Sequence, residues 1–106
     1  MRSFTPKQLV EYLAKAEPPP LLLDVREPWE FDICHLDNAV LIPMGSIPNQ
    51  LQHIDPAQEI VLICHHGVRS RRVGFYLQQH GFLRLINLEG GVDAWARDVD
   101  FNMATY

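Results

Sequence analysis

The sequence predicts an α/β fold in which a mostly parallel sheet of about four to five strands carries helices on both faces. The first observation is that short apolar runs, typical of buried strands, alternate along the chain with segments typical of helices. The second is that 106 residues, 47% of them hydrophobic and 21% charged, match one globular domain, residues 1–106. Parallel sheets of this kind place functional sites at the carboxyl ends of their strands.

The first helix is predicted to begin after Thr5, a suitable N-cap. Pro6 fits the first helical position, and Gln8 completes a capping box with Thr5. A buried strand is expected over Leu21–Val25, because a short continuous apolar run follows a proline break. A short helix opens over Glu27–Phe31, with a proline and two acidic residues in its first turn.

The remaining elements continue the alternation of strands and helices. Pro43 stops the next strand, and the helix after it is weak because it contains a proline. The helix before Gly81 ends at a residue typical of a helix C-terminus. In order, these elements are a strand over Ala39–Ile42, a weak helix over Ser46–Ile54, a strand over Glu59–Ile63, a helix over Ser70–His80, a strand over Leu83–Leu88 and a helix over Gly91–Arg97.

Charge and cysteine usage narrow the class of protein. The net charge of −4 does not favour a nucleic-acid partner, and no apolar run approaches the roughly 20 residues of a membrane span. No secretory signal is expected, because the first residues contain no apolar h-region. The two cysteines, Cys34 and Cys64, do not make a disulfide framework. We therefore expect a cytoplasmic protein that binds neither nucleic acid nor membrane.

The candidate site is the loop Cys64–Ser70. The stretch from Ile60 to Leu88 has arginines but no acidic residue, which indicates a local anion site. Cys64 follows the strongest strand, and a helix begins shortly after, so the loop N–H groups are expected to form an anion-binding nest at a helix N-terminus. Arg69 adds a full charge, which favours the reactive thiolate of Cys64. Gly67 permits a turn that a Cβ would hinder.

The residues of the loop allow two other interpretations. Cys64 could be a small buried apolar residue at a strand end, a common place for cysteine. Cys64, His65 and His66 could instead be zinc ligands, but their spacing is not that of a zinc site and no second ligand pair lies nearby in the sequence. We therefore expect a nucleophilic cysteine and no metal.

Four segments in the right order resemble the signatures of the rhodanese family, in particular its small single-domain sulfurtransferases. The resemblance covers nearly the whole chain. Any one segment alone is a weak signal, and the presence of all four in the same order makes the resemblance specific. The segments are Leu22–Phe31, His35–Pro43, Cys64–Arg69 and Leu88–Trp95.

This resemblance implies a three-layer rhodanese-like fold and transfer of sulfane sulfur through a Cys64 persulfide. The donor is a small anion such as thiosulfate, the acceptor is cyanide or a thiol, and a protein thiol is one such acceptor. No metal or organic cofactor is required. The loop amides support the sulfur electrostatically, as in other nucleophilic catalysis by an activated cysteine. The substrate-binding loop then comprises His65, His66, Gly67, Val68, Arg69 and Ser70.

Three residues outside the loop each allow two interpretations. Cys34 and Asn38 stand where the family usually has glycine, and Cys34 is either a redox-active thiol or, as we favour, a packed small residue. Asp24 and Arg26 either line the site or form an internal ion pair, and we favour the pair.

Trp29 and Trp95 are expected to be core aromatics.

Three alternative functions stay open at this stage. A sulfur carrier for a protein partner shares the persulfide chemistry, and a non-catalytic module would ordinarily lack the cysteine that stands at Cys64. A phosphatase or arsenate reductase also uses a loop cysteine and arginine, but the phosphatase pattern has arginine six positions after the cysteine. Here Ser70 occupies that position, one residue after Arg69.

Overall fold

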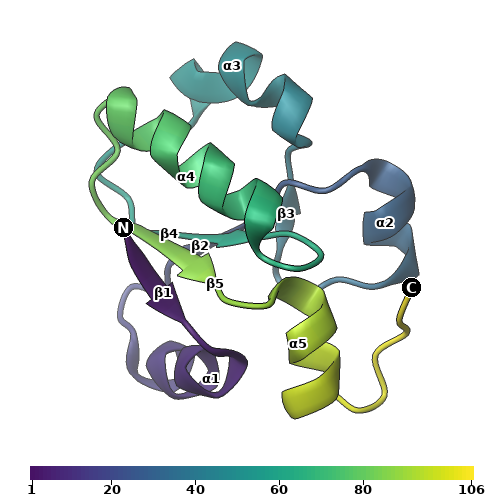
Figure 1. The fold of residues 1–106 in the computed structure, drawn as a ribbon. Coiled ribbons are helices and arrows are strands. Elements are labelled where there is room, and N and C mark those ends of the chain that lie inside the picture. The colour runs from purple at the N-terminus through teal and green to yellow at the C-terminus, as the bar shows by residue number, and fades with distance from the viewer.

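The computed structural model describes residues 1–106 and confirms the α/β class. Five strands form one parallel sheet in the order β1-β5-β4-β2-β3 (Figure 1). Every neighbouring pair is parallel, as expected when helices connect the strands. The strands are β1 (Arg2–Phe4), β2 (Leu21–Asp24), β3 (Val40–Leu41), β4 (Ile60–Ile63) and β5 (Leu85–Leu88).

Five helices accompany the sheet, and the first of them begins at the capping box that the sequence predicts. The predicted capping box is present: Gln8 N donates to Thr5 Oγ1 at 3.2 Å, and Thr5 N donates to Gln8 Oε1 at 2.9 Å. The weak helix expected over Ser46–Ile54 is broken into a short α-helix between two 3₁₀ turns. The helices are α1 (Pro6–Lys15), α2 (Pro28–Ile33), α3 (Ile47–Gln50), α4 (Val68–Gln79) and α5 (Gly91–Asp98).

The central strand β4 supplies both hydrophobic layers, because alternate side chains of a strand point to opposite faces. Leu62 packs in a cluster with Leu77 of α4, whereas Val61 packs in a second cluster with Leu9 of α1 and Val92 of α5. Figure 1 shows α4 on one side of the sheet and α1 on the other. The strand is therefore buried on both faces, which explains its continuous apolar sequence.

The register of the strands brings three carboxyl ends to one edge of the sheet. Asp24 is paired with Ile63, and Leu62 is paired with Asn87. The loop that begins at Cys64 therefore emerges between the ends of β2 and β5, where parallel sheets hold their sites.

The sequence analysis missed one strand, and its expectation for one tryptophan was wrong. Strand β1 was not predicted, because it is a three-residue edge strand whose Arg2 and Ser3 are exposed and give no buried pattern. Trp29 is not a core residue: it is 60% exposed on α2, whereas Trp95 is half-buried against the second cluster as expected. No helix has the length and apolar character needed to cross a membrane.

Candidate active site

The sulfur of Cys64 lies at the centre of the loop between β4 and α4. Gly67 N donates a hydrogen bond to Cys64 Sγ at 3.0 Å, and Ser70 Oγ lies 3.2 Å from the same sulfur. The residue is 1% exposed. Two polar groups from the loop and the first turn of α4 thus surround a buried sulfur.

Asn87, on β5, fixes both of these groups. Its Oδ1 accepts a hydrogen bond from Ser70 Oγ at 2.5 Å, and its Nδ2 donates to the carbonyl of Gly67 at 3.2 Å. Asn87 and Ser70 are fully buried, so each amide atom is committed to one partner. Since the Ser70 hydrogen is given to Asn87, a protonated Cys64 is left to donate to Ser70 Oγ.

The loop holds its shape through close backbone contacts. Gly67 has a φ of +91°, and a Cβ there would lie 3.1 Å from Gly90 N. A Cβ on Gly91 would lie 2.3 Å from the Cys64 carbonyl oxygen, so only glycine lets α5 approach this closely. Val92 N donates to that carbonyl at 2.9 Å, which ties the start of α5 to the loop.

The N–H groups on the other side of the loop have no protein acceptor. Those of His65, His66 and Val68 take no part in the hydrogen bonds of the structure, whereas the carbonyls of Cys64 and His65 accept from α5. N–H groups at the start of a helix are ordinarily unsatisfied within it. The loop therefore offers free donors, as the sequence predicts for an anion nest.

The guanidinium of Arg69 forms an ion pair with an acidic side chain beside the loop. Its Nη1 and Nη2 donate to Glu30 Oε2 and Oε1 at 2.7 and 2.8 Å, so its fork is occupied by a carboxylate of α2. The bond to Glu30 is the largest cause of a raised pKa of Arg69, and the charge of Cys64 contributes in the same direction. Arg69 thus adds charge near the site while its donors bind Glu30.

The tail folds back over the loop through Tyr106. Its ring stacks on His65 with centroids 3.8 Å apart and planes inclined by 10°. Its hydroxyl donates to Glu30 Oε1 at 2.7 Å and accepts from Arg26 Nη1 at 3.0 Å. Burial first, and then the bond to Glu30, raise the pKa of Tyr106 to about 12. Trp29 packs edge-on against the same ring at 5.7 Å.

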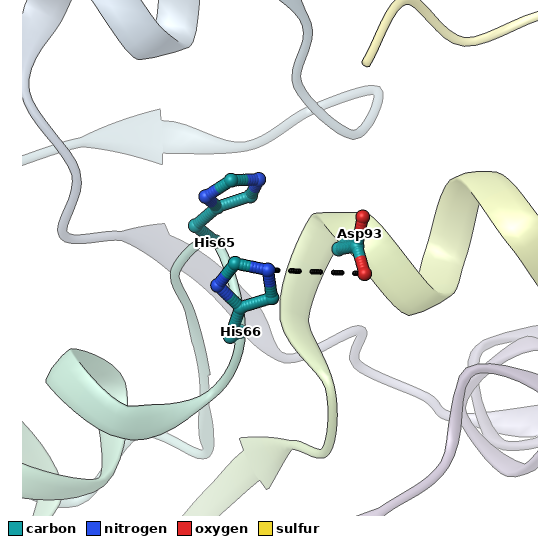
Figure 2. A group of neighbouring side chains, drawn as sticks. All are labelled: His65, His66 and Asp93. Carbon is teal, nitrogen blue, oxygen red and sulfur yellow. Dashed lines mark ion pairs between the residues drawn. The ribbon is translucent and has the colours of Figure 1, made fainter. Parts of the chain in front are cut away.

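The two histidines of the loop lie beside an acidic residue of α5. Figure 2 shows His65 and His66 projecting from the loop and Asp93 facing them. His66 Nε2 lies 3.8 Å from Asp93 Oδ2. Burial, and then the neighbouring His66, lower the pKa of His65, which favours its neutral form. The loop ends at Gly67, and Val68, the first residue of α4, is 62% exposed.

Asp24 and Arg26 form the internal ion pair that we favoured. Arg26 Nη2 donates to Asp24 Oδ2 at 2.7 Å, and both side chains are fully buried. Arg26 also donates to the carbonyls of Glu30 and Cys34 at the end of α2. Cys34 is half-buried, with its sulfur 3.8 Å from Arg26 Nη1. These contacts join β2, α2 and the tail behind the loop.

The sequence did not identify three residues that the fold adds to this site: Glu30, Asn87 and Tyr106. Asn87 had a recognisable signal, since it is a polar residue inside an apolar strand and such a residue needs a buried partner.

Asn38 stands at a turn where the resembling family usually has glycine. Its φ of +69° lies in the left-handed region that favours glycine, which explains the usual residue there.

Comparison with known proteins extends the likeness beyond short motifs. A family model described as a rhodanese-like domain matches residues 5–98. A protein of Allochromatium vinosum named "Sulfurtransferase" is 39% identical over 77 residues, which are 73% of this chain and 72% of that protein. "Probable adenylyltransferase/sulfurtransferase MoeZ" of Mycobacterium tuberculosis is 35% identical over 106 residues; the match covers 98% of this chain and 27% of that longer protein.

Solved structures agree with these sequence matches. The crystal structure of a rhodanese-like domain protein from Staphylococcus aureus superimposes with a TM-score of 0.82 at 36% identity, over 90% of this chain and 91% of that one. Residues 5–98, which the family model matches, include β2, β4 and β5 and the loop that joins β4 to α4.

Proposed function

This chain belongs to the rhodanese-like sulfurtransferase family, and we propose that it moves sulfane sulfur from a small anionic donor such as thiosulfate to cyanide or a thiol through a persulfide on Cys64. The observation that carries the proposal is the position of Cys64 Sγ, 3.0 Å from the N–H of Gly67 in a loop whose other N–H groups are free. Donors arranged in this way favour negative charge on sulfur.

The first half of the reaction forms the persulfide. The Cys64 thiolate attacks the outer sulfur of thiosulfate, a new S–S bond forms, and the S–S bond of thiosulfate breaks as sulfite leaves with the electron pair. Ser70 Oγ lies between Cys64 Sγ and Asn87 Oδ1 and is in hydrogen-bond contact with both. When Cys64 is ionised, the Ser70 hydroxyl can therefore turn its hydrogen from Asn87 to the sulfur. His65, His66 and Val68 would supply N–H donors to the bound anion.

The second half returns the enzyme to its starting state. The acceptor attacks the outer sulfur of the persulfide, and Cys64 leaves as the thiolate, so no oxidant and no metal is consumed. The near-complete burial of Cys64 favours donors and acceptors that present one terminal sulfur or nucleophilic atom. Asp24 and Arg26 support the loop from behind by holding α2 and the tail.

A protein thiol as the natural acceptor has one observation in its favour. Val68, the first residue of α4 after the loop, is 62% exposed, and Trp29, which packs on Tyr106 beside the loop, is 60% exposed. Large apolar side chains at the rim of a site fit a macromolecular partner better than a small ion. We place this chemistry in the cytoplasm, where thiols stay reduced.

Intact-protein mass spectrometry after incubation with thiosulfate tests the proposal. We expect one added sulfur atom that cyanide removes, with thiocyanate as the product. Cys64→Ala should show neither the added sulfur nor thiocyanate, while Cys34→Ser should show both, because only Cys64 lies in the nest. Circular dichroism confirms that each variant is folded. Thiocyanate formation by folded Cys64→Ala protein would refute the mechanism, and its loss in Cys34→Ser would show that Cys34 takes part.

A further inference from the structure

The fold brings together three metal-binding side chains that are not adjacent in the sequence. His65 and His66 come from the loop after β4, and Asp93 comes from the first turn of α5 (Figure 2). One ligand atom from each lies within 4.8 Å of the other two. We propose that His65, His66 and Asp93 bind a divalent transition-metal ion of the zinc class. The cysteine–histidine set considered from sequence is a different one, because Cys64 is not in this cluster.

The donor set matches the ion. Two imidazoles and one carboxylate are the ligands of a zinc site with three protein ligands, in which water fills the open position. With bond lengths near 2.1 Å, donors of a tetrahedral site lie about 3.4 Å apart. The His66 Nε2–Asp93 Oδ2 distance of 3.8 Å is already close to this value, and no separation exceeds 4.8 Å, so none has to close by more than about 1.4 Å. The side chains of His66 and Asp93 are 60% and 40% exposed, so they have room to make this adjustment and to leave a position for water.

The backbone that carries the ligands is already fixed. Asp93 N donates to the His65 carbonyl at 3.1 Å, and Val92 N donates to the Cys64 carbonyl at 2.9 Å. Gly91 permits this approach, since a Cβ there would lie 2.4 Å from the His65 oxygen. The two elements that supply the ligands are therefore held in contact before an ion binds, which lowers the cost of ordering the site.

The side chain of His65 is also held in place, because its ring stacks on the ring of Tyr106 with centroids 3.8 Å apart. One cation competes for the carboxylate: Arg97 Nη1 lies 3.8 Å from Asp93 Oδ2. Arg97 is 66% exposed, so a metal ion can displace it at little cost.

Calorimetric titration of the protein with zinc chloride, after treatment with a chelator, measures the site without any enzyme assay. We expect one ion per chain and a rise in the melting temperature, because an ion that binds only the folded state stabilises it. His66→Ala and Asp93→Asn should each weaken binding by at least about tenfold, the loss seen when even an outer-shell partner is removed. His80→Ala and Glu89→Gln, which change exposed residues outside the cluster, should leave zinc binding unchanged.

Cys64→Ala separates this site from adventitious binding by the thiol. It should retain the zinc affinity of the unmodified chain, because Cys64 is not among the three ligands. The proposal is overturned if no zinc binds, if Asp93→Asn binds as tightly as Glu89→Gln, or if Cys64→Ala abolishes binding. Melting curves in chelator show that each variant is folded. None of these measurements uses sulfur transfer. The zinc site can therefore be refuted without refuting the proposed sulfur transfer, and sulfur transfer can be refuted without refuting the zinc site.

Discussion

Arg69 of α4 and Glu30 of α2 form a bidentate ion pair beside the loop that carries Cys64. The Nη1–Oε2 and Nη2–Oε1 distances are 2.7 and 2.8 Å, and the Glu30 side chain is 4% exposed. This contact is the largest cause of a Glu30 pKa of about 2, well below its ordinary value of 4.5. The pair therefore links α2 to the helix that carries the site while Glu30 is ionised.

Acid should weaken the fold through this pair. The pKa of Glu30 is lower in the folded chain than in the unfolded chain, so the stabilisation is complete above about pH 4.5 and is lost as the pH falls toward about 2. A shift of this size corresponds to about 3 kcal/mol of unfolding free energy. We expect Glu30→Gln to be less stable than the unmodified chain at neutral pH and to approach it near pH 2, as measured by urea unfolding.

An exposed acidic residue provides the control for this measurement. Glu89→Gln should follow the unmodified chain across the same pH range, because Glu89 is exposed and has no ion-pair partner in the structure. If the Glu30→Gln and unmodified curves stay parallel from neutral pH to acid, the pair does not contribute stability in this way.

Asn87 should control the reactivity of Cys64 without touching it. Asn87→Asp keeps an acceptor for Ser70, loses the donor to the Gly67 carbonyl and places a buried carboxylate near the sulfur. A negative charge there disfavours the thiolate. We expect alkylation of Cys64 by iodoacetamide at neutral pH, and kcat/KM for thiosulfate, to fall together by about tenfold or more.

The matched variant is Asn49→Asp, which makes the same change on an exposed residue and should leave both rates unaltered. A purely structural Asn87 would lower the melting temperature and leave the alkylation rate of the folded protein unchanged. That result would remove Asn87 from the site.

The sequence predicted the fold far better than it predicted the surroundings of the sulfur. Apolar runs identify β2, β4 and β5 because these strands are buried, whereas β1 escapes because an edge strand needs no apolar pattern. Cys64 and its loop were found because strand, cysteine, glycine and helix are consecutive. Glu30 and Tyr106 were not, since they reach the loop only through tertiary contacts.

Tyr106 should set the ionisation of His65. The ring of Tyr106 stacks on His65, and burial is the largest cause of the lowered pKa of that histidine. Tyr106→Ala should therefore raise the His65 pKa toward its ordinary value of 6.5, measured by NMR titration of the imidazole. Tyr106→Phe keeps the ring and loses the hydroxyl bonds to Arg26 and Glu30, so we expect it to lower stability by about 1–2 kcal/mol with a smaller effect on His65. Equal titration of His65 in both variants would contradict the stacking argument.

The loop should not support phosphatase activity. A loop of that class resembles Cys-x5-Arg, so its arginine stands six residues after the cysteine. Here the residue six positions after Cys64 is Ser70, whose Oγ lies 3.2 Å from the sulfur. Arg69 stands five positions after Cys64 and binds Glu30 with both terminal nitrogens. A bidentate clamp on phosphate oxygens needs that fork to be free and correctly aimed.

We therefore expect negligible hydrolysis of p-nitrophenyl phosphate under conditions in which thiosulfate sulfur is transferred. Glu30→Gln tests whether the ion pair is the reason, because it releases the guanidinium of Arg69. That variant should still fail to hydrolyse the phosphate ester. Arg69 stands one residue before the position of the phosphatase arginine, and one residue of a helix such as α4 is a rotation of about 100°. Inserting one residue between Gly67 and Arg69 should reduce sulfur transfer, because it widens a ring of N–H groups fitted to one sulfur. Phosphate release that depends on Cys64 in the unmodified protein would contradict the loop-length argument and favour a phosphatase.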